Sequence, residues 1–172
     1  MNNPQYMSGT GNNFLVSEYE NSKTDIEIIS IVADSLFDID GVIYVEKIDS
    51  LTVKMHYYNN DGSTAELCVN GIRCVAKYAL DNSIVDSNEV TVVAPIGNIK
   101  TNIKENTVTI EVTIPTYENN KLLIDGLECI KSNIGNPHLL VEVDNVDKFD
   151  LEQFVKKVYG TKEFEKGVNV EI

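Results

Sequence analysis

One cysteine stands where a helix is predicted to begin, and such a position can support proton-transfer chemistry. Cys68 follows a β-rich run, 51–58, and the turn signal Asn60-Asp61-Gly62, whose residue types tolerate turn dihedrals. Apolar residues then recur at helical spacing from Ile72 to Leu80. Backbone N–H groups and the positive end of the dipole at a helix start lower the pKa of a thiol and can hold a carboxylate. A thiolate beside a bound carboxylate can remove the α-proton of an amino acid.

The structural alternative is that Cys68 belongs to the core, because free cysteine is usually a small buried hydrophobe. The other cysteines are Cys74 and Cys129, and an odd count without paired spacing argues against a disulfide framework and against a zinc site. Three reduced thiols fit a cytoplasmic location. We expect no signal peptide, and no apolar run approaches membrane-spanning length.

The length and charge of the chain limit its number of domains and its possible partners. The chain has 172 residues, enough for one ordinary domain or two small lobes, and its 42% hydrophobic content supports a packed core. Fourteen basic residues against twenty-seven acidic residues give a net charge of −13. This balance argues against nucleic acid and anionic membranes as partners.

Short strands and three helices must position the residues that do chemistry. The stretch 9–16 is a Gly-rich turn that enters a strand, and further strand-like runs cover 42–45, 51–58, 89–94, 96–103 and 107–114. Helical patterns cover 25–36, 72–80 and 151–159, and the stretch 118–126 is loop-like. The apolar face of helix 72–80 needs covering, and many short strands can wrap it. We therefore predict an α+β fold, with a mostly antiparallel sheet curled around this helix.

The helix predicted over 25–36 has Thr24 as its N-cap. Its apolar stripe is interpreted as core packing; it consists of Ile28, Ile29, Val32, Ala33 and Leu36.

Four segments carry a resemblance to a known family. The longest runs Tyr58-Asn59-Asn60-Asp61-Gly62-Ser63 and then Cys68-Val69-Asn70-Gly71-Ile72-Arg73-Cys74; the others are Gly9-Thr10-Gly11-Asn12-Asn13-Phe14, Gly135-Asn136-Pro137-His138 and Val168-Asn169. In order and spacing they resemble the diaminopimelate epimerase family, whose first catalytic cysteine lies in the block that matches the longest segment. The resemblance extends from Gly9 to Asn169 and matches the first half of the family's sequence.

The resemblance implies a cofactor-independent isomerase that converts LL- to meso-diaminopimelate in lysine and cell-wall precursor biosynthesis, without pyridoxal phosphate or metal. Cys68 would be one of two catalytic thiols, and His138 would support the thiols. The resemblance also implies substrate contacts from the side chains of Asn12, Asn59, Asn136 and Asn169, and from the backbone N–H groups of Val69, Asn70 and Gly71. We expect the asparagines to converge around Cys68.

The chain also departs from the family pattern. Val69 replaces a glycine, and its β-branched side chain narrows the backbone choices beside the catalytic cysteine. Gly41 stands where some members place a substrate-contacting glutamine. The family's second lobe, with the second catalytic cysteine, is not matched. We therefore interpret 1–172 as an N-terminal lobe that holds half an active site and is inactive without a second lobe or partner chain.

Two other readings stay open from the sequence. The chain could be a related amino-acid isomerase of the same fold, of the proline-racemase or phenazine-biosynthesis kind. Alternatively, it is a non-catalytic remnant that binds a ligand or partner, which the missing lobe and Val69 favour. The Asn-Asp-Gly-Ser and Gly-Asn-Pro-His segments favour the epimerase.

Overall fold

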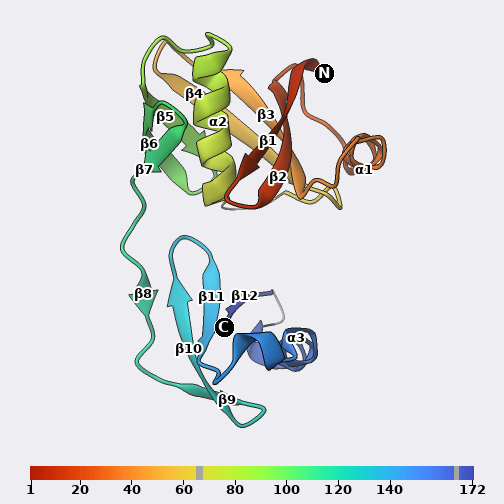
Figure 1. The fold of residues 1–172 in the computed structure, drawn as a ribbon, viewed down its shortest axis with the longest axis vertical. Coiled ribbons are helices and arrows are strands. Elements are labelled where there is room, and N and C mark those ends of the chain that lie inside the picture. The colour runs from red at the N-terminus through yellow and green to blue at the C-terminus, as the bar shows by residue number, and fades with distance from the viewer. Residues whose placement is uncertain (65–67, 165–166) are drawn as a thin grey trace. The chain divides into compact units, whose positions relative to one another are not determined.

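The chain folds into two compact units. The computed structural model describes residues 1–64, 68–164 and 167–172, and divides them into unit 1, Met1–Glu111, and unit 2, Val112–Ile172 (Figure 1). The sequence pattern did not predict this division into two units. The assignment of 1–172 to one N-terminal lobe stays a prediction.

Unit 1 is built on a seven-stranded sheet whose spatial order follows the chain. Its strands are β1 (Asn2–Gly9), β2 (Asn12–Glu18), β3 (Gly41–Lys47), β4 (Thr52–Asn59), β5 (Glu89–Ala94), β6 (Gly97–Lys104) and β7 (Thr107–Ile110). Neighbours pair antiparallel, except that β2 is parallel to β3 and β4 is parallel to β5. The mostly antiparallel sheet is therefore confirmed, whereas strand β1 was not predicted.

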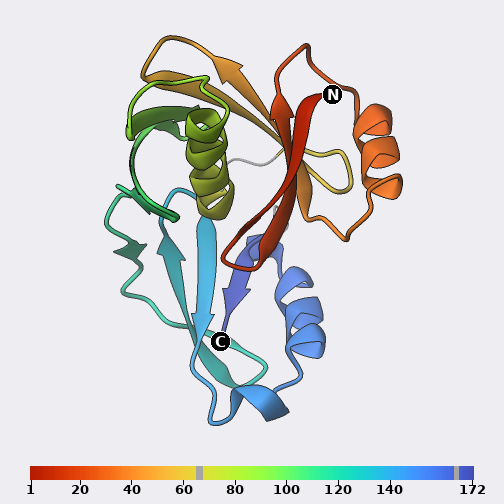
Figure 2. The ribbon, with the colours of Figure 1, turned by 45° about the horizontal axis from the view of Figure 1, so that its top comes forward.

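The sheet curls around helix α2 (Val69–Asp81), as Figure 2 shows. The predicted apolar face of α2 is fully buried; its members are Ile72, Val75, Ala76 and Ala79. They pack against alternate side chains of the strands, such as Phe14 and Val16 on β2 and Ile43 and Val45 on β3. Because burying an aliphatic side chain stabilises a fold by about 1.5–3 kcal/mol, this helix is the centre of the first core.

Helix α1 (Asp25–Ala33) lies on the outer side of the same sheet (Figures 1 and 2). Thr24 caps it as predicted, in a capping box with Glu27. The interpretation of its stripe as core packing is largely wrong. Ile28 is buried, but Ile29 and Leu36 are 47% and 82% exposed. The helix ends at Ala33, before Leu36, and Ile28 is its one fully buried residue.

Unit 2 is a smaller sheet with a helix on one face. The strands are β8 (Thr116–Tyr117), β9 (Leu122–Ile124), β10 (Leu127–Asn133), β11 (Pro137–Val141) and β12 (Asn169–Glu171), and they lie in the order β12-β11-β10-β8 with β9 also paired to β10. Helix α3 (Leu151–Tyr159) buries Phe154 and Val158 against Cys129 and Leu139. The short strand β9 lies within the stretch predicted to be a loop.

Among the helices of the described residues, none is both long and apolar enough to span a membrane.

Candidate active site

Cys68 occupies the start of α2, as the sequence predicts. It is the N-cap residue, with extended backbone at φ −136° and ψ 91°, and its carbonyl accepts from the N–H of Ile72 at 2.9 Å. Its Sγ accepts from the N–H of Gly71 at 3.3 Å. The preceding residues of the family block, 65–67, lie outside the described part of the chain.

The expected lowering of the Cys68 pKa is wrong in its net direction. Burial of the thiol raises the pKa and outweighs the lowering by the N–H groups of Gly71 and Asn70. The negative charge of Asp40 raises it further, and Arg73 lowers it. The helix-start effect on the Cys68 pKa is therefore present, but burial outweighs it.

The other two cysteines are more deeply buried than Cys68. Cys74 is 4% exposed on the core side of α2, where burial raises its pKa to about 11. Cys129 lies fully buried in unit 2, and burial raises its pKa as well. Neither side chain is placed to act on a ligand in solution.

Two predicted substrate contacts lie together beside Cys68. Asn70, two residues after Cys68, donates from its Nδ2 to Oδ1 of Asn12 at 2.6 Å. Asn12 in turn donates from its Nδ2 to Oδ2 of Asp40 at 3.4 Å, and the same carboxylate accepts from the backbone N–H of Asn13 at 2.7 Å. Asn13 thus contributes through its backbone, although its side chain replaces the family's aspartate.

Asn59 lies at the same end of the sheet. It ends β4 and pairs with Gly41, the first residue of β3, which pairs in turn with Phe14 of β2. The Nδ2 of Asn59 donates to Oγ of Ser63 at 2.9 Å, and Ser63 donates to Asp61 at 2.6 Å, so the turn after β4 is tied down by its own side chains. Asn12 at the start of β2 and Asn59 at the end of β4 therefore lie at the ends of two strands that only β3 separates.

Tyr57 also belongs to this region, although the sequence patterns did not predict it as a site residue. A Cβ added at Gly41 would lie 2.5 Å from Cε2 and 3.1 Å from the hydroxyl of Tyr57, so the ring occupies the space that glycine leaves. Burial raises the Tyr57 pKa, and the charges of Cys68 and Asp40 add to the rise. The absence of a side chain at Gly41 was the one signal that a neighbour could fill this place.

The remaining predicted residues form a second cluster within unit 2. His138 on β11 lies with its Nε2 3.0 Å from Oδ1 of Asn136 and its Nδ1 3.2 Å from Glu171. Asn169 on β12 pairs with His138 and donates from its Nδ2 to the carbonyl of Pro137 at 3.2 Å. Both ring nitrogens thus face an oxygen acceptor, and a neutral imidazole can donate to only one of them.

Glu171 was not predicted. The convergence of Asn136, His138 and Asn169 with Cys68 stays a prediction, because Cys68 belongs to unit 1 and these residues to unit 2.

The Gly71 N–H, predicted to hold a carboxylate, is directed at the Cys68 sulfur in this structure. Its role toward a ligand, and those of Val69 and Asn70, stay predictions. Among the described residues, no group of three or more His, Cys, Asp or Glu side chains could hold a metal ion.

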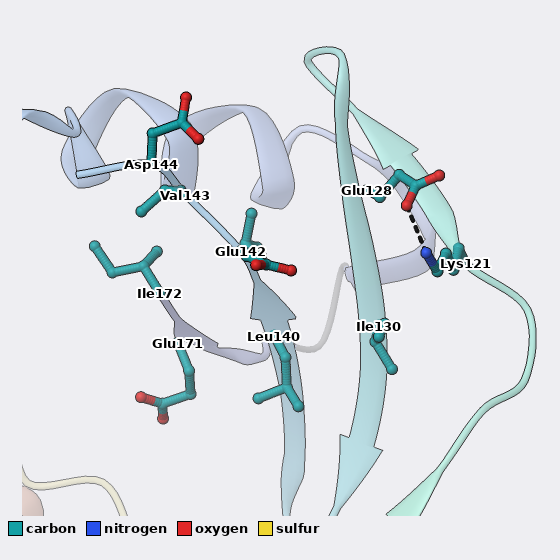
Figure 3. Close-up of a pocket in the computed structure, with 10 residues that line it drawn as sticks. Lys121, Glu128, Ile130, Leu140, Glu142, Val143, Asp144, Glu171 and Ile172 are labelled. Atoms are coloured by element: carbon teal, nitrogen blue, oxygen red, sulfur yellow. Dashed lines mark hydrogen bonds and ion pairs between the residues drawn. The ribbon is translucent and has the colours of Figure 1, made fainter. Parts of the chain in front are cut away.

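A pocket of about 790 Å³ lies in unit 2 (Figure 3). Its walls combine Ile130, Leu140, Val143 and Ile172 with the carboxylates of Glu128, Glu142, Asp144 and Glu171. Lys121 pairs with Glu128 at 2.5 Å. Because no thiol lines this pocket and its carboxylates would repel an α-carboxylate, it is not the candidate site for amino-acid chemistry.

Comparison with known proteins agrees with the motif evidence. The family described as "Diaminopimelate epimerase" matches residues 5–118, a range that ends seven residues beyond unit 1. A diaminopimelate epimerase of Methanocella arvoryzae is 32% identical and is matched over 95% of this chain and 66% of its own length. That of Thermotoga maritima is 31% identical, over 95% of this chain and 67% of its own length.

The chain thus spans about two thirds of these relatives, more than the half expected from its motifs.

Solved structures share the fold at low sequence identity. A phenazine biosynthesis protein of the PhzF family from Bacillus anthracis has a TM-score of 0.63 at 17% identity, covering 90% of this chain and 61% of its own. A hydroxyproline epimerase from Agrobacterium vitis has a TM-score of 0.60 at 14% identity, covering 81% and 52%. The family match and the similarity to curated relatives lead to one conclusion: this chain belongs to the diaminopimelate epimerase family.

Proposed function

We propose that this chain supplies one catalytic thiol, Cys68, and half of the substrate site for cofactor-independent epimerisation of diaminopimelate between the LL and meso forms. The observation that supports this most is the position of Cys68 as the N-cap of α2, beside the linked amides of Asn70 and Asn12. The similarity to relatives named diaminopimelate epimerase supports diaminopimelate as the substrate.

The proposed reaction needs a base and an acid on opposite faces of the α-carbon. One thiolate takes the α-proton, and the electron pair left on carbon delocalises into the α-carboxylate, which the N–H groups at the start of α2 would hold. A thiol on the opposite face then donates its proton to the same carbon, which inverts the centre. In this scheme Cys68 donates the proton in one direction of the reaction and removes it in the other.

The second thiol is proposed to come from a second lobe or a partner chain. Cys74 lies on the same helix as Cys68 and is buried, so these two cannot bracket one α-carbon. Cys129 is fully buried against α3. About a third of each relative's own length is not matched by this chain, which is where a second lobe would lie.

Assay of the purified chain in deuterated water tests this proposal. We expect no inversion of LL-diaminopimelate by the chain alone, and inversion with deuterium at the α-carbon once the unmatched C-terminal region of a relative is added. Cys68→Ala should abolish the restored turnover, whereas the matched control Cys74→Ala should keep it. Inversion by this chain alone would contradict the need for a second thiol from elsewhere.

A second candidate is a protein that binds an amino acid without turning it over. Val69 in place of the family's glycine and the raised pKa of Cys68 favour it. Binding of diaminopimelate with no inversion in the reconstituted assay would select this candidate. A related isomerase of the same fold would instead invert another amino acid, such as proline, in that assay.

A further inference from the structure

Arg73 is the only arginine in the chain, and it lies in the second turn of α2. Its Nη2 donates to two neutral oxygens, Oγ1 of Thr10 and Oδ1 of Asn70. Within the described residues it forms no ion pair with a carboxylate. A guanidinium carries five donors in a rigid fork, which suits the fixing of two acceptors at once.

One of these acceptors sits on a strained turn. Thr10 and Gly11 connect β1 to β2 with φ values of 54° and 95°. Positive φ is unusual for a β-branched residue, so Thr10 needs support from its surroundings. The turn also approaches the helix closely, because a Cβ added at Gly9 would lie 2.5 Å from the backbone oxygen of Asn70. Arg73 ties this strained turn to the first turn of α2.

The other acceptor fixes the direction of a chain of amides. Because arginine has donors only, the Asn70 amide must turn its oxygen toward Arg73 and its Nδ2 toward Asn12. The Asn12 oxygen accepts that bond at 2.6 Å, so Asn12 directs its own Nδ2 toward Asp40. One bond from this nitrogen to Asp40 is long, at 3.4 Å, and an amide nitrogen has two hydrogens to donate.

We propose that Arg73 is a positioning residue: through Asn70 it orients Asn12 so that Asn12 meets the ligand as a hydrogen-bond donor. The ligand group at this point is then an acceptor, a carboxylate oxygen of the amino acid, which rests on the proposed function. The side chain of Asn70 is used within this network, so it orients Asn12 and leaves ligand contact at Asn70 to the backbone.

The orientation itself can be tested without a ligand, by ¹⁵N relaxation and hydrogen exchange of side-chain amides in the full chain. In the wild type, Nδ2 of Asn12 and Asn70 should be ordered, with S² above about 0.8. In Arg73→Met, both should fall below about 0.6, with exchange at least about fivefold faster. Lys77→Met is the matched control, because Lys77 lies one turn further along α2 and contacts Asp81.

Arg73→Lys is the second variant, in case the methionine variant does not fold. A lysine keeps the charge but lacks the fork, so the Asn12 amide should still lose order relative to the Lys77→Met control. Unchanged order at Asn12 in a folded Arg73 variant would overturn the proposal.

Ligand contact is read separately, as protection of Cys68 from iodoacetamide by meso-diaminopimelate. Half-protection should need about tenfold more ligand in Arg73→Met, with each protein compared with its own alkylation rate in the absence of ligand. No protection in the wild type would count against the proposed function, and the amide measurement would still decide the role of Arg73. Protection at equal concentrations in both proteins would overturn the positioning role toward the ligand.

Discussion

The sulfur of Cys68 accepts a hydrogen bond from the backbone N–H of Gly71 at 3.3 Å, so the thiol that caps α2 rests on the first turn of its own helix. Gly71 allows this arrangement because it carries no side chain where the helix meets the sheet. A Cβ at this position would lie 2.8 Å from Cε of Met55, 3.0 Å from Cδ1 of Ile43 and 3.3 Å from the Cys68 sulfur.

Gly71→Ala should therefore destabilise unit 1. Overpacking costs about 1–3 kcal/mol, and the better helix propensity of alanine returns about 1 kcal/mol, so we expect a net loss of up to about 2 kcal/mol. Urea unfolding measures it. The control is Gly160→Ala at the end of α3, where the nearest atom would be 3.4 Å away and no loss is expected. Equal effects of the two substitutions would contradict the packing argument.

Cys68 should react faster with iodoacetamide than Cys74 and Cys129. It is half-buried, whereas the other two thiols are buried and all three have raised pKa values. Mass spectrometry of peptides after timed alkylation gives the three rates. The Cys68 rate should rise with pH along a curve displaced to higher pH than that of a free thiol. Equal rates at the three sites would remove the reason to assign chemistry to Cys68.

Alkaline pH should weaken the fold through Cys74. Its pKa is raised to about 11 in the folded chain, so the unfolded chain loses this proton first as the pH rises above about 9. The stabilisation of the fold by the protonated Cys74 thiol is complete below pH 9 and is lost as the pH rises through about 11. At pH 11 the loss of unfolding free energy amounts to about 2 kcal/mol.

The contribution of Cys74 is measured as the difference between the wild type and Cys74→Ala in unfolding free energy across this range. The comparison is necessary because Tyr44 and Tyr78, with pKa values raised to about 12, titrate in both proteins. The cavity left by alanine lowers stability at every pH, and the gap between the two proteins should narrow from pH 9 to 11. A constant gap would show that Cys74 does not titrate in this window.

The apolar residues of α1 should differ sharply in their effect on stability. Ile28→Ala should cost about 2–5 kcal/mol, because Ile28 is fully buried on the outer face of the sheet with Leu15 and Val42. Leu36→Ser should change stability by less than about 0.5 kcal/mol, because Leu36 is exposed. Thermal or urea unfolding of both variants measures these changes. Comparable losses of unfolding free energy in the two variants would support the predicted packing of the whole stripe in the core.

The sequence by itself determined features that rest on short-range interactions. The apolar spacing of Ile72, Val75 and Ala79 marked α2 and its buried face, and the types of Thr24 and Cys68 marked two helix starts. These features follow from hydrogen bonds and periodicity within a few residues, which a local pattern contains. The family block around Cys68 also identified the family.

Only the tertiary structure decided which of these residues are buried and what they meet. The pKa of Cys68 is raised because residues distant in sequence bury it, and burial outweighs the local effect of the helix start. The contact of Asn70 with Asn12 joins residues 58 positions apart. Likewise, the exposure of Leu36 and the place of Tyr57 over Gly41 depend on how the strands pair. Such contacts come from long-range packing, and no local pattern in the chain encodes them.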